Sequence, residues 1–273
     1  MGEHLRRRVI ASILVGLLSA GCAGGAPERR APSYPTLTRA VVTTEDVERS
    51  IEDERALAAS SARLPGPGEA WFTVLDGCAE VLVTAPHATR PMRDGQLRFA
   101  DSGTGALAIA IHRLTGARTI YTNMASPSDP NYYDDNAFKA AVARALSTPR
   151  PLVVLDLHAS HAYRPYDVDF GTMGRASLLG REDLLAGLAA ALAREGPTNQ
   201  SLDYFAAARN ETITKWVSAR GVPAIQLEIS ATCLSPGAGA MEAHRYAQLL
   251  QGIVRFIGST GCAKGAAPAG GRP

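Results

Sequence analysis

Three short apolar runs in this chain end at residues that can bind a metal ion or move a proton. Runs of this length, rich in β-branched residues and bounded by glycine or proline, are typical of buried strands. The carboxyl ends of parallel strands lie at one edge of a sheet, so we expect the three polar side chains to meet there in a single buried metal site. The runs and the residues that follow them are 81–85 with His87, 152–157 with His158, and 224–227 with Glu228.

Stretches with helical periodicity alternate with these runs, and this alternation predicts an α/β fold with a mostly parallel central sheet. We expect helices near residues 105–114, 136–146, 181–194, 213–220 and 241–256, and further strands at 118–122 and 167–170. Residues 71–75 and 80–85 flank Asp76 and Gly77, a pair suited to a tight turn with positive φ, so we expect these two strands to form a hairpin.

The first residues have the features of an export signal. Three arginines at positions 6–8 precede an apolar stretch, residues 9–18, that is too short to span a bilayer. Ser19-Ala20-Gly21-Cys22 resembles a bacterial lipobox, so we expect cleavage after residue 21 and lipidation of Cys22. The alternative is simple cleavage nearby, which would release a soluble periplasmic protein. The prediction is a lipoprotein of the bacterial cell envelope that faces the periplasm and contacts the membrane through its lipid anchor.

Composition divides the rest of the chain into three parts. Residues 22–64 begin with Ala, Pro and Gly and are predicted to be a tether that contains one polar helix at 44–59. Residues 65–262 are predicted to be a single catalytic domain of ordinary size. The remaining residues, 263–273, are rich in Gly, Ala and Pro, a composition typical of a disordered tail.

Charge argues against nucleic acid as a partner. The chain has 28 basic and 26 acidic side chains, and loss of residues 1–21 would remove three arginines and one glutamate, leaving 25 of each sign. A neutral domain without a cluster of Lys and Arg is not expected to bind a polyanion.

Four cysteines occur in a chain predicted to enter an oxidising compartment. With Cys22 lipidated, at most one intramolecular disulfide remains. Cys78 precedes a strand and Cys262 follows the last helix, which places both at the amino-terminal edge of the sheet, whereas Cys233 follows a strand at the opposite edge. We therefore expect Cys78 to pair with Cys262 and the thiols to be structural.

The histidines narrow the choice of metal ligands. The candidates are His87, His158 and His161, because His4 would leave with the signal and the other two lie inside expected helices. His158 ends a buried strand, where an imidazole without a partner would be costly. Asp156, two residues earlier and hence on the same side of the strand, could orient an imidazole by a hydrogen bond, or else cap a loop.

A third ligand is needed, because hydrolytic zinc sites use three protein ligands and leave one position for water. We expect it to be Asp101, which precedes a glycine-rich turn and a helix. The alternative role of Asp101 is an N-cap of that helix.

Further side chains are candidates for the reaction itself. Glu228 lies between Leu227 and Ile229, where burial should raise its pKa and suit it to act as a general base, unless it forms a structural salt bridge. Arg164 could bind a substrate carboxylate or a developing oxyanion, and His161 could assist the transition state. Arg90 and Asn210 are candidates for substrate binding, with surface or capping roles as alternatives.

Val83-Thr84-Ala85-Pro86-His87, Leu155-Asp156-Leu157-His158 and Ile225-Gln226-Leu227-Glu228-Ile229 together resemble the N-formylglutamate amidohydrolase family, one of the zinc-carboxypeptidase-like hydrolases. The resemblance implies a three-layer α/β/α fold, one zinc ion, and hydrolysis of a linear amide in a small acidic or peptide-like substrate. It implies His87 and His158 as zinc ligands and Glu228 as the proton shuttle. Carboxypeptidases place a glutamate three residues after the first histidine, but this chain has Arg90 there, so the carboxylate ligand must come from elsewhere.

Two functions follow from these residues. The first is an envelope zinc amidohydrolase acting on an N-acyl amino acid or a peptide-like amide, with a cell-wall peptide as a plausible substrate. The second is a lipoprotein that keeps the fold and the metal but only binds a ligand. A serine esterase is disfavoured because the chain has no Gly-x-Ser-x-Gly motif.

Overall fold

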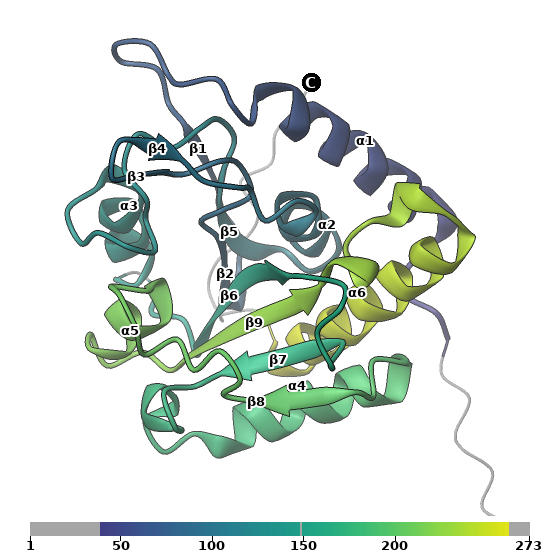
Figure 1. Cartoon of the computed structure of the whole chain (residues 1–273). Coiled ribbons are helices and arrows are strands. Elements are labelled where there is room, and N and C mark those ends of the chain that lie inside the picture. Colours follow the sequence, from purple (N-terminus) through teal and green to yellow (C-terminus); the bar gives the residue numbers. More distant parts are fainter. Residues whose placement is uncertain (1–38, 148, 262–273) are drawn as a thin grey trace, which may run out of the picture. The chain divides into compact units, whose positions relative to one another are not determined.

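The computed structural model describes residues 39–147 and 149–261, and the described residues from Ala40 to Gly261 form one compact unit (Figure 1). Its helices are α1 (Thr44–Ser60), α2 (Thr104–Thr115), α3 (Ala137–Ala145), α4 (Glu182–Glu195), α5 (Ile213–Ser218) and α6 (Ala240–Thr260). Its strands are β1 (Phe72–Leu75), β2 (Ala79–Ala85), β3 (Met92–Arg93), β4 (Gln96–Leu97), β5 (Ala117–Thr122), β6 (Val153–Ser160), β7 (Val168–Gly171), β8 (Gln200–Leu202) and β9 (Ala224–Ser230).

A seven-stranded sheet has the order β1-β5-β2-β6-β9-β7-β8. Strands β5, β2, β6 and β9 are parallel neighbours, while β1 and β7 run antiparallel to their inner neighbours. The mostly parallel α/β sheet expected from the sequence is therefore confirmed.

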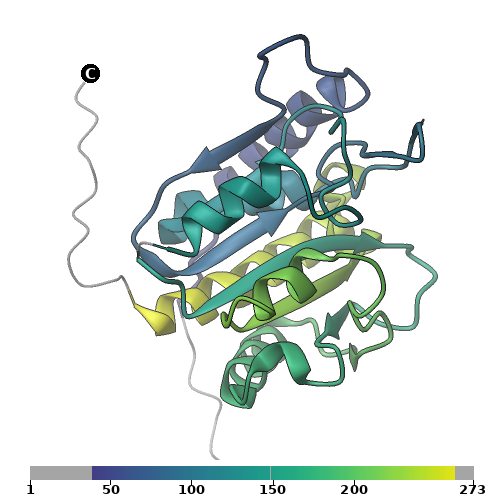
Figure 2. The same ribbon diagram turned by 90° about the vertical axis from the view of Figure 1, so that its left-hand side faces the viewer.

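Helices cover both faces of this sheet, which makes a three-layer α/β/α arrangement (Figure 2). Alternate residues of β2 point to opposite layers: Val81 and Val83 pack with α2, α4 and α6, whereas Leu82 packs with α3 and α5. Because strand side chains alternate between faces, a strand buried on both sides needs an unbroken apolar run, and the sequence of β2 has one. Within the described residues, no helix is both long enough and apolar enough to cross a membrane.

The expected hairpin between residues 71–75 and 80–85 is wrong. Strand β5 lies between β1 and β2, pairing antiparallel with the first and parallel with the second. Neither Asp76 nor Gly77 has the positive φ that a tight hairpin turn requires. Instead the backbone N–H of Cys78 donates to the carbonyl of Gly116 at 2.9 Å, so this connection packs against the start of β5.

The helix expected at residues 44–59 is present as α1, with Thr43 and Asp46 forming a capping box at its amino end. It packs against α2 and belongs to the same compact unit as the sheet. The unit thus begins before residue 65, where the sequence placed its start, because the apolar side of α1 is covered by the domain.

Cysteine pairing is described in part. Cys233 is a free, buried thiol, and Cys78 is disulfide-bonded. The expected partner Cys262, the lipidation site Cys22, the signal (residues 1–21) and the tail (263–273) all lie outside the described residues. The backbone N–H of Glu80 donates to the carbonyl of Gly261 at 3.3 Å, so the end of α6 adjoins the start of β2.

Candidate active site

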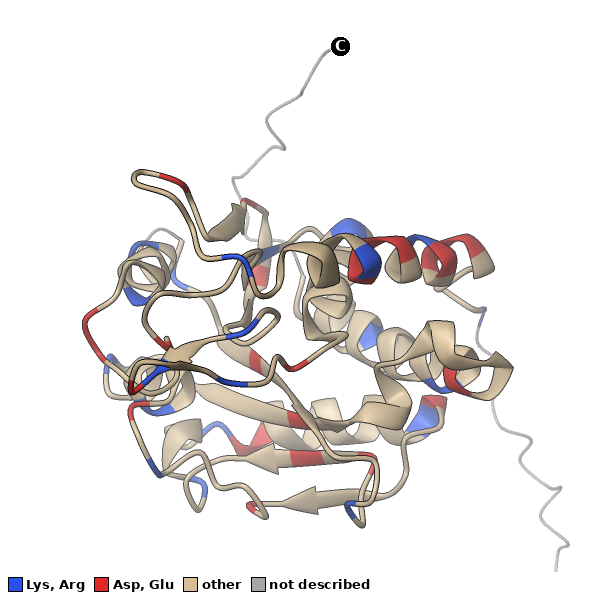
Figure 3. Cartoon of the chain, turned by 45° about the horizontal axis from the view of Figure 1, so that its top comes forward, with Lys and Arg blue, Asp and Glu red and all other residues tan. Residues whose placement is uncertain are grey.

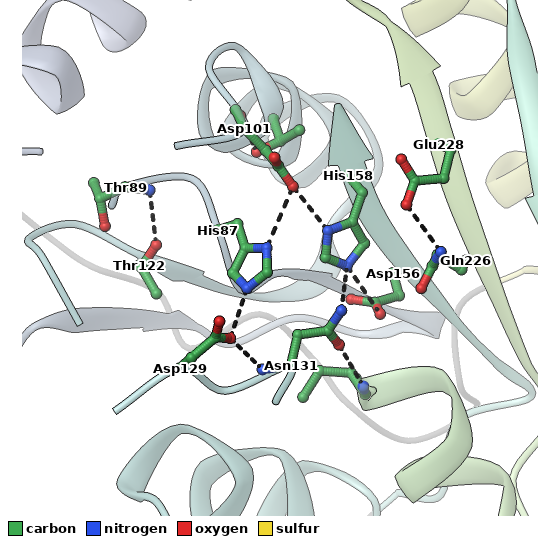
Figure 4. Close-up of polar contacts among 12 residues, drawn as sticks. His87, Thr89, Asp101, Thr122, Asp129, Asn131, Asp156, His158, Gln226 and Glu228 are labelled. Carbon is green, nitrogen blue, oxygen red and sulfur yellow. Dashed lines mark hydrogen bonds and ion pairs between the residues drawn. The ribbon is translucent and has the colours of Figure 1, made fainter. Parts of the chain in front are cut away.

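His87, Asp101 and His158 meet at the carboxyl-terminal edge of the sheet (Figure 4). Each offers one ligand atom, and these atoms lie within 4.8 Å of one another. The Asp101 Oδ2 atom lies 2.8 Å from Nδ1 of His158 and 3.5 Å from Nδ1 of His87. The three residues that the sequence assigned to a metal are therefore brought together.

Local structure explains this convergence. Pro86 ends β2, and the turn that carries His87 is pinned where the Thr89 N–H donates to Thr122 Oγ1 at 3.0 Å. Asp101 is tied to the same turn, since its N–H donates to the His87 carbonyl at 2.8 Å. Gly103, and not Asp101, occupies the N-cap position of α2, so the Asp101 carboxylate contacts the two imidazoles instead of capping the helix.

Opposing effects set the protonation of these residues. Burial lowers the pKa of His87, but the charges and hydrogen bonds of Asp129 and Asp101 outweigh it and raise this pKa to about 9. For His158, burial is outweighed by Asp156 and Asp101, which raise its pKa well above the usual value. Burial alone would raise the pKa of Asp101, yet the two histidines hold it far below its ordinary range. Without a metal, both imidazoles therefore tend to hold protons beside the ionised carboxylate of Asp101. A metal cation that binds here would replace these protons.

Asp129 supports His87 from behind, and the sequence analysis missed it. The Oδ1 atom of this fully buried carboxylate lies 2.7 Å from Nε2 of His87, while Oδ2 accepts hydrogen bonds from Arg93 Nε at 2.9 Å and from its NH2 group at 2.6 Å. With Nε2 held by Asp129, Nδ1 of His87 faces Asp101. Asp129 lies in the loop after β5, a fourth parallel strand. Its position beyond the carboxyl end of that strand is the sequence feature that could have indicated that it lies near the cluster.

Replacing Asp129 by asparagine should weaken metal binding at this cluster about 10-fold to 100-fold, because carboxylates that orient a ligating histidine have effects of this size. Chelator competition on the purified protein would measure it. The matched control is Asp135→Asn on an exposed position of the same loop. Equal affinity of the Asp129 variant and the control would contradict the orienting role.

Asp156 supports His158, and Asn131 lies beside the same imidazole. Nε2 of His158 lies 3.4 Å from Oδ2 of Asp156, in line with the orienting role expected for that carboxylate, and Thr84 Oγ1 donates to the other oxygen at 2.7 Å. Nδ2 of Asn131 lies 3.3 Å from the same imidazole nitrogen, and its Oδ1 accepts the N–H of Ile213 at the start of α5 at 2.7 Å. Asn131 was also missed by the sequence analysis.

Glu228 lies beside His158, its partner in the β6–β9 register. Burial raises the pKa of Glu228 to about 7, and the nearby positive charge of His158 opposes this rise. Its Oε1 accepts a hydrogen bond from Gln226 Nε2 at 3.0 Å. Among the described residues no cation forms a salt bridge with Glu228, so the salt-bridge alternative is not supported.

A cleft of about 580 Å³ adjoins the cluster. Glu228, Gln226 and Asn131 line it on the side of the cluster, and residues 203–210, between β8 and α5, form most of its wall. Asp203, Ala207 and Asn210 in this wall have positive φ, which is uncommon outside glycine.

Acidic residues lie on strands of the central sheet as well as in loops and helices (Figure 3). Asp169 in β7 pairs with Glu228 in the register and is fully buried. Its carboxylate accepts hydrogen bonds from the N–H groups of Tyr204 and Phe205, at 3.1 and 2.8 Å. Asp169 therefore fixes the cleft wall to the sheet.

The other predicted site residues occupy different places. Asn210 lines the cleft. Arg164 lies at its edge, donating to the hydroxyl of Tyr204 at 3.1 Å. His161 is exposed, and its imidazole stacks on the ring of Tyr163 with the two ring centroids 5.0 Å apart. Arg90 donates to the carbonyls of Arg98 and Leu97, at 3.0 and 3.3 Å, so its guanidinium holds the β3–β4 hairpin and not the cleft.

No family model and no curated protein matches this chain. Among solved structures, N-formylglutamate amidohydrolase from Ralstonia eutropha JMP134 is similar, with a TM-score of 0.51 and 13% identity over 69% of this chain and 97% of that one. Glutaminyl cyclase from an Acidobacteriales bacterium gives a TM-score of 0.48 and 14% identity over 86% and 100% of the two chains. A putative carboxypeptidase from Burkholderia mallei ATCC 23344 gives 0.43 and 13% over 76% and 68%. The resemblance to N-formylglutamate amidohydrolase inferred from the sequence is thus confirmed at the level of the fold.

Proposed function

We propose that this protein is a metal-dependent amidohydrolase that cleaves a linear amide in an N-acyl amino acid or a peptide-like substrate. The observation that carries the proposal is the cluster of His87, Asp101 and His158 next to a half-buried carboxylate, Glu228, that lines a cleft. The fold shared with an amidohydrolase supports the same reaction class.

The donor set fits zinc. Two imidazoles and one carboxylate are a typical ligand set for a hydrolytic zinc ion, and three ligands leave one position open. The Nε2 atoms of His87 and His158 lie near buried carboxylates, so the Nδ1 atoms remain for the metal. A bound zinc ion supplies Lewis acidity, which polarises a carbonyl and makes a water molecule more acidic.

The residues of the chain account for the proton transfers. Glu228, with a pKa raised by burial, is suited to take a proton from the attacking water and to pass it to the leaving nitrogen. Asn131 and Gln226, on the same side of the cleft, could orient the amide by hydrogen bonds. Arg164, held on the aromatic rings of the cleft edge, is suited to bind a carboxylate of the substrate.

The proposed location is the bacterial cell envelope, with the lipid on Cys22 as the membrane contact. This location favours a cell-wall peptide as the substrate over a free formylated amino acid. The proposal of the anchor is supported by the sequence of residues 1–22.

Metal content and hydrolysis together test the function. Residues 23–273, purified without the anchor, should contain one equivalent of zinc and should release amines from a panel of N-acyl amino acids and muropeptides. A chelator should abolish this activity and added zinc should restore it. Protein that binds no zinc even when it is offered would overturn the hydrolase and leave the ligand-binding function.

A further inference from the structure

We propose that α1 is a structural part of the metal-binding site and not a spacer between the amino-terminal segment and the domain. In this proposal Leu57 and Glu54 of α1 set the position of Asp101 relative to His87. The inference rests on the proposed metal site, and it adds a group of positioning residues far from the cluster in sequence.

Leu57 joins α1 to both segments that carry these ligands. It is 6% exposed and packs against Gly105 in the first turn of α2. A Cβ atom on Gly105 would lie 2.5 Å from Leu57 Cδ1 and 2.8 Å from Cβ of Ala88, the neighbour of His87. Helix α1, helix α2 and the turn that carries His87 therefore meet at Gly105, where there is no room for a side chain. Because this contact is closely packed, a shift of α1 would displace α2 and the turn.

Glu54 acts one turn earlier in α1. Glu54 and Gly103, which lies two residues after Asp101, line the same small cavity, and Oε2 of Glu54 is buried there without a hydrogen-bond partner among the described residues. Gly103 has φ +87°, and a Cβ atom there would lie 2.2 Å from the carbonyl oxygen of Leu234. Gly103 thus packs closely against Leu234 and lies beside Glu54. We infer that this packing fixes the conformation of the turn that carries Asp101. Burial of the Glu54 carboxylate is costly, since it raises the pKa of this group to about 7.

The end of α1 is tied to the same region by two further hydrogen bonds. The N–H of Arg90, three residues after His87, donates to the carbonyl of Ser61 at 3.2 Å. Ser60 Oγ donates to the carbonyl of Asn123 at 2.6 Å, at the start of the loop that carries Asp129. The carboxyl end of α1 therefore contacts both the segment that follows His87 and the loop that carries Asp129.

Zinc affinity of α1 variants tests this proposal. We expect Glu54→Ala and Leu57→Ala to raise the zinc dissociation constant about tenfold, within the range seen when groups outside the ligand set are lost. Glu54→Gln keeps an acceptor oxygen and should stay within about twofold of wild type. The matched control is Glu52→Ala, an exposed glutamate of the same helix. Cobalt substitution gives a second measurement, because a displaced Asp101 should alter the visible absorption bands of bound Co²⁺.

Two results would overturn the inference, and they are distinguishable. Folded Glu54→Ala and Leu57→Ala proteins with wild-type zinc affinity and an unchanged cobalt spectrum would show that α1 contributes only to stability. Wild-type protein that binds no zinc would overturn the proposed function as well. Circular dichroism at the temperature of the titration confirms that each variant is folded.

Discussion

Replacing His158 by alanine should weaken zinc binding by at least about 100-fold, beyond the effect expected for groups that only orient a ligand. His158 is 3% exposed, and its Nδ1 lies 2.8 Å from the Asp101 carboxylate. Replacement by alanine removes one of the three donor groups and leaves the carboxylates of Asp101 and Asp156 without their imidazole partner. Elemental analysis and chelator competition on purified protein would measure the loss.

His244→Ala, on an exposed position of α6, is the control for removal of a histidine. His87→Ala provides a second variant in case His158→Ala does not fold. The zinc affinity of the wild type should also rise from pH 6 to pH 8, since His87, with a pKa raised to about 9, must lose its proton before Nδ1 can bind a metal. A folded His158→Ala protein that retains one equivalent of zinc at wild-type affinity would place the metal elsewhere.

Glu228→Gln should lower kcat about 100-fold to 10,000-fold while zinc content is unchanged, because general acid–base catalysis contributes this much and Gln cannot take a proton. The substitution keeps the shape of the side chain and its contact with Gln226. The rate should be measured with the amide that the substrate panel identifies, alongside Glu182→Gln, an exposed control on α4.

The pH profile gives a separate test of Glu228. The active form is the carboxylate, so kcat/KM of the wild type should fall as pH drops through the pKa of this group. That pKa is about 7 without a metal, and a bound cation stabilises the carboxylate and moves the midpoint lower. A Glu228→Gln enzyme that retains both its rate and this acid limb would assign the proton transfer to another residue.

The sequence predicted that His87, His158 and Glu228 lie together because each is close to the carboxyl end of an apolar strand, and parallel strands bring such positions together whatever the loops do. Strands β6 and β9 continue for two residues beyond His158 and Glu228, so these two side chains lie within their strands and do not follow them. Asp129 and Asn131 escaped prediction for the opposite reason. They lie in an irregular loop after β5, where periodicity carries no information about which way a side chain points. The same limit explains the hairpin error, because insertion of β5 between β1 and β2 is a long-range pairing that the local turn sequence does not encode.

The separation between the metal-binding cluster and the cleft wall has an evolutionary consequence. The ligands and their supports come from β2, β6 and the loops around them, whereas one continuous segment, residues 203–210, forms most of the wall. If the proposed function is correct, mutations in that segment can therefore change which amide is accepted while the metal-binding cluster stays intact. A lineage that carries this fold could acquire new substrates by exchange or lengthening of a single loop.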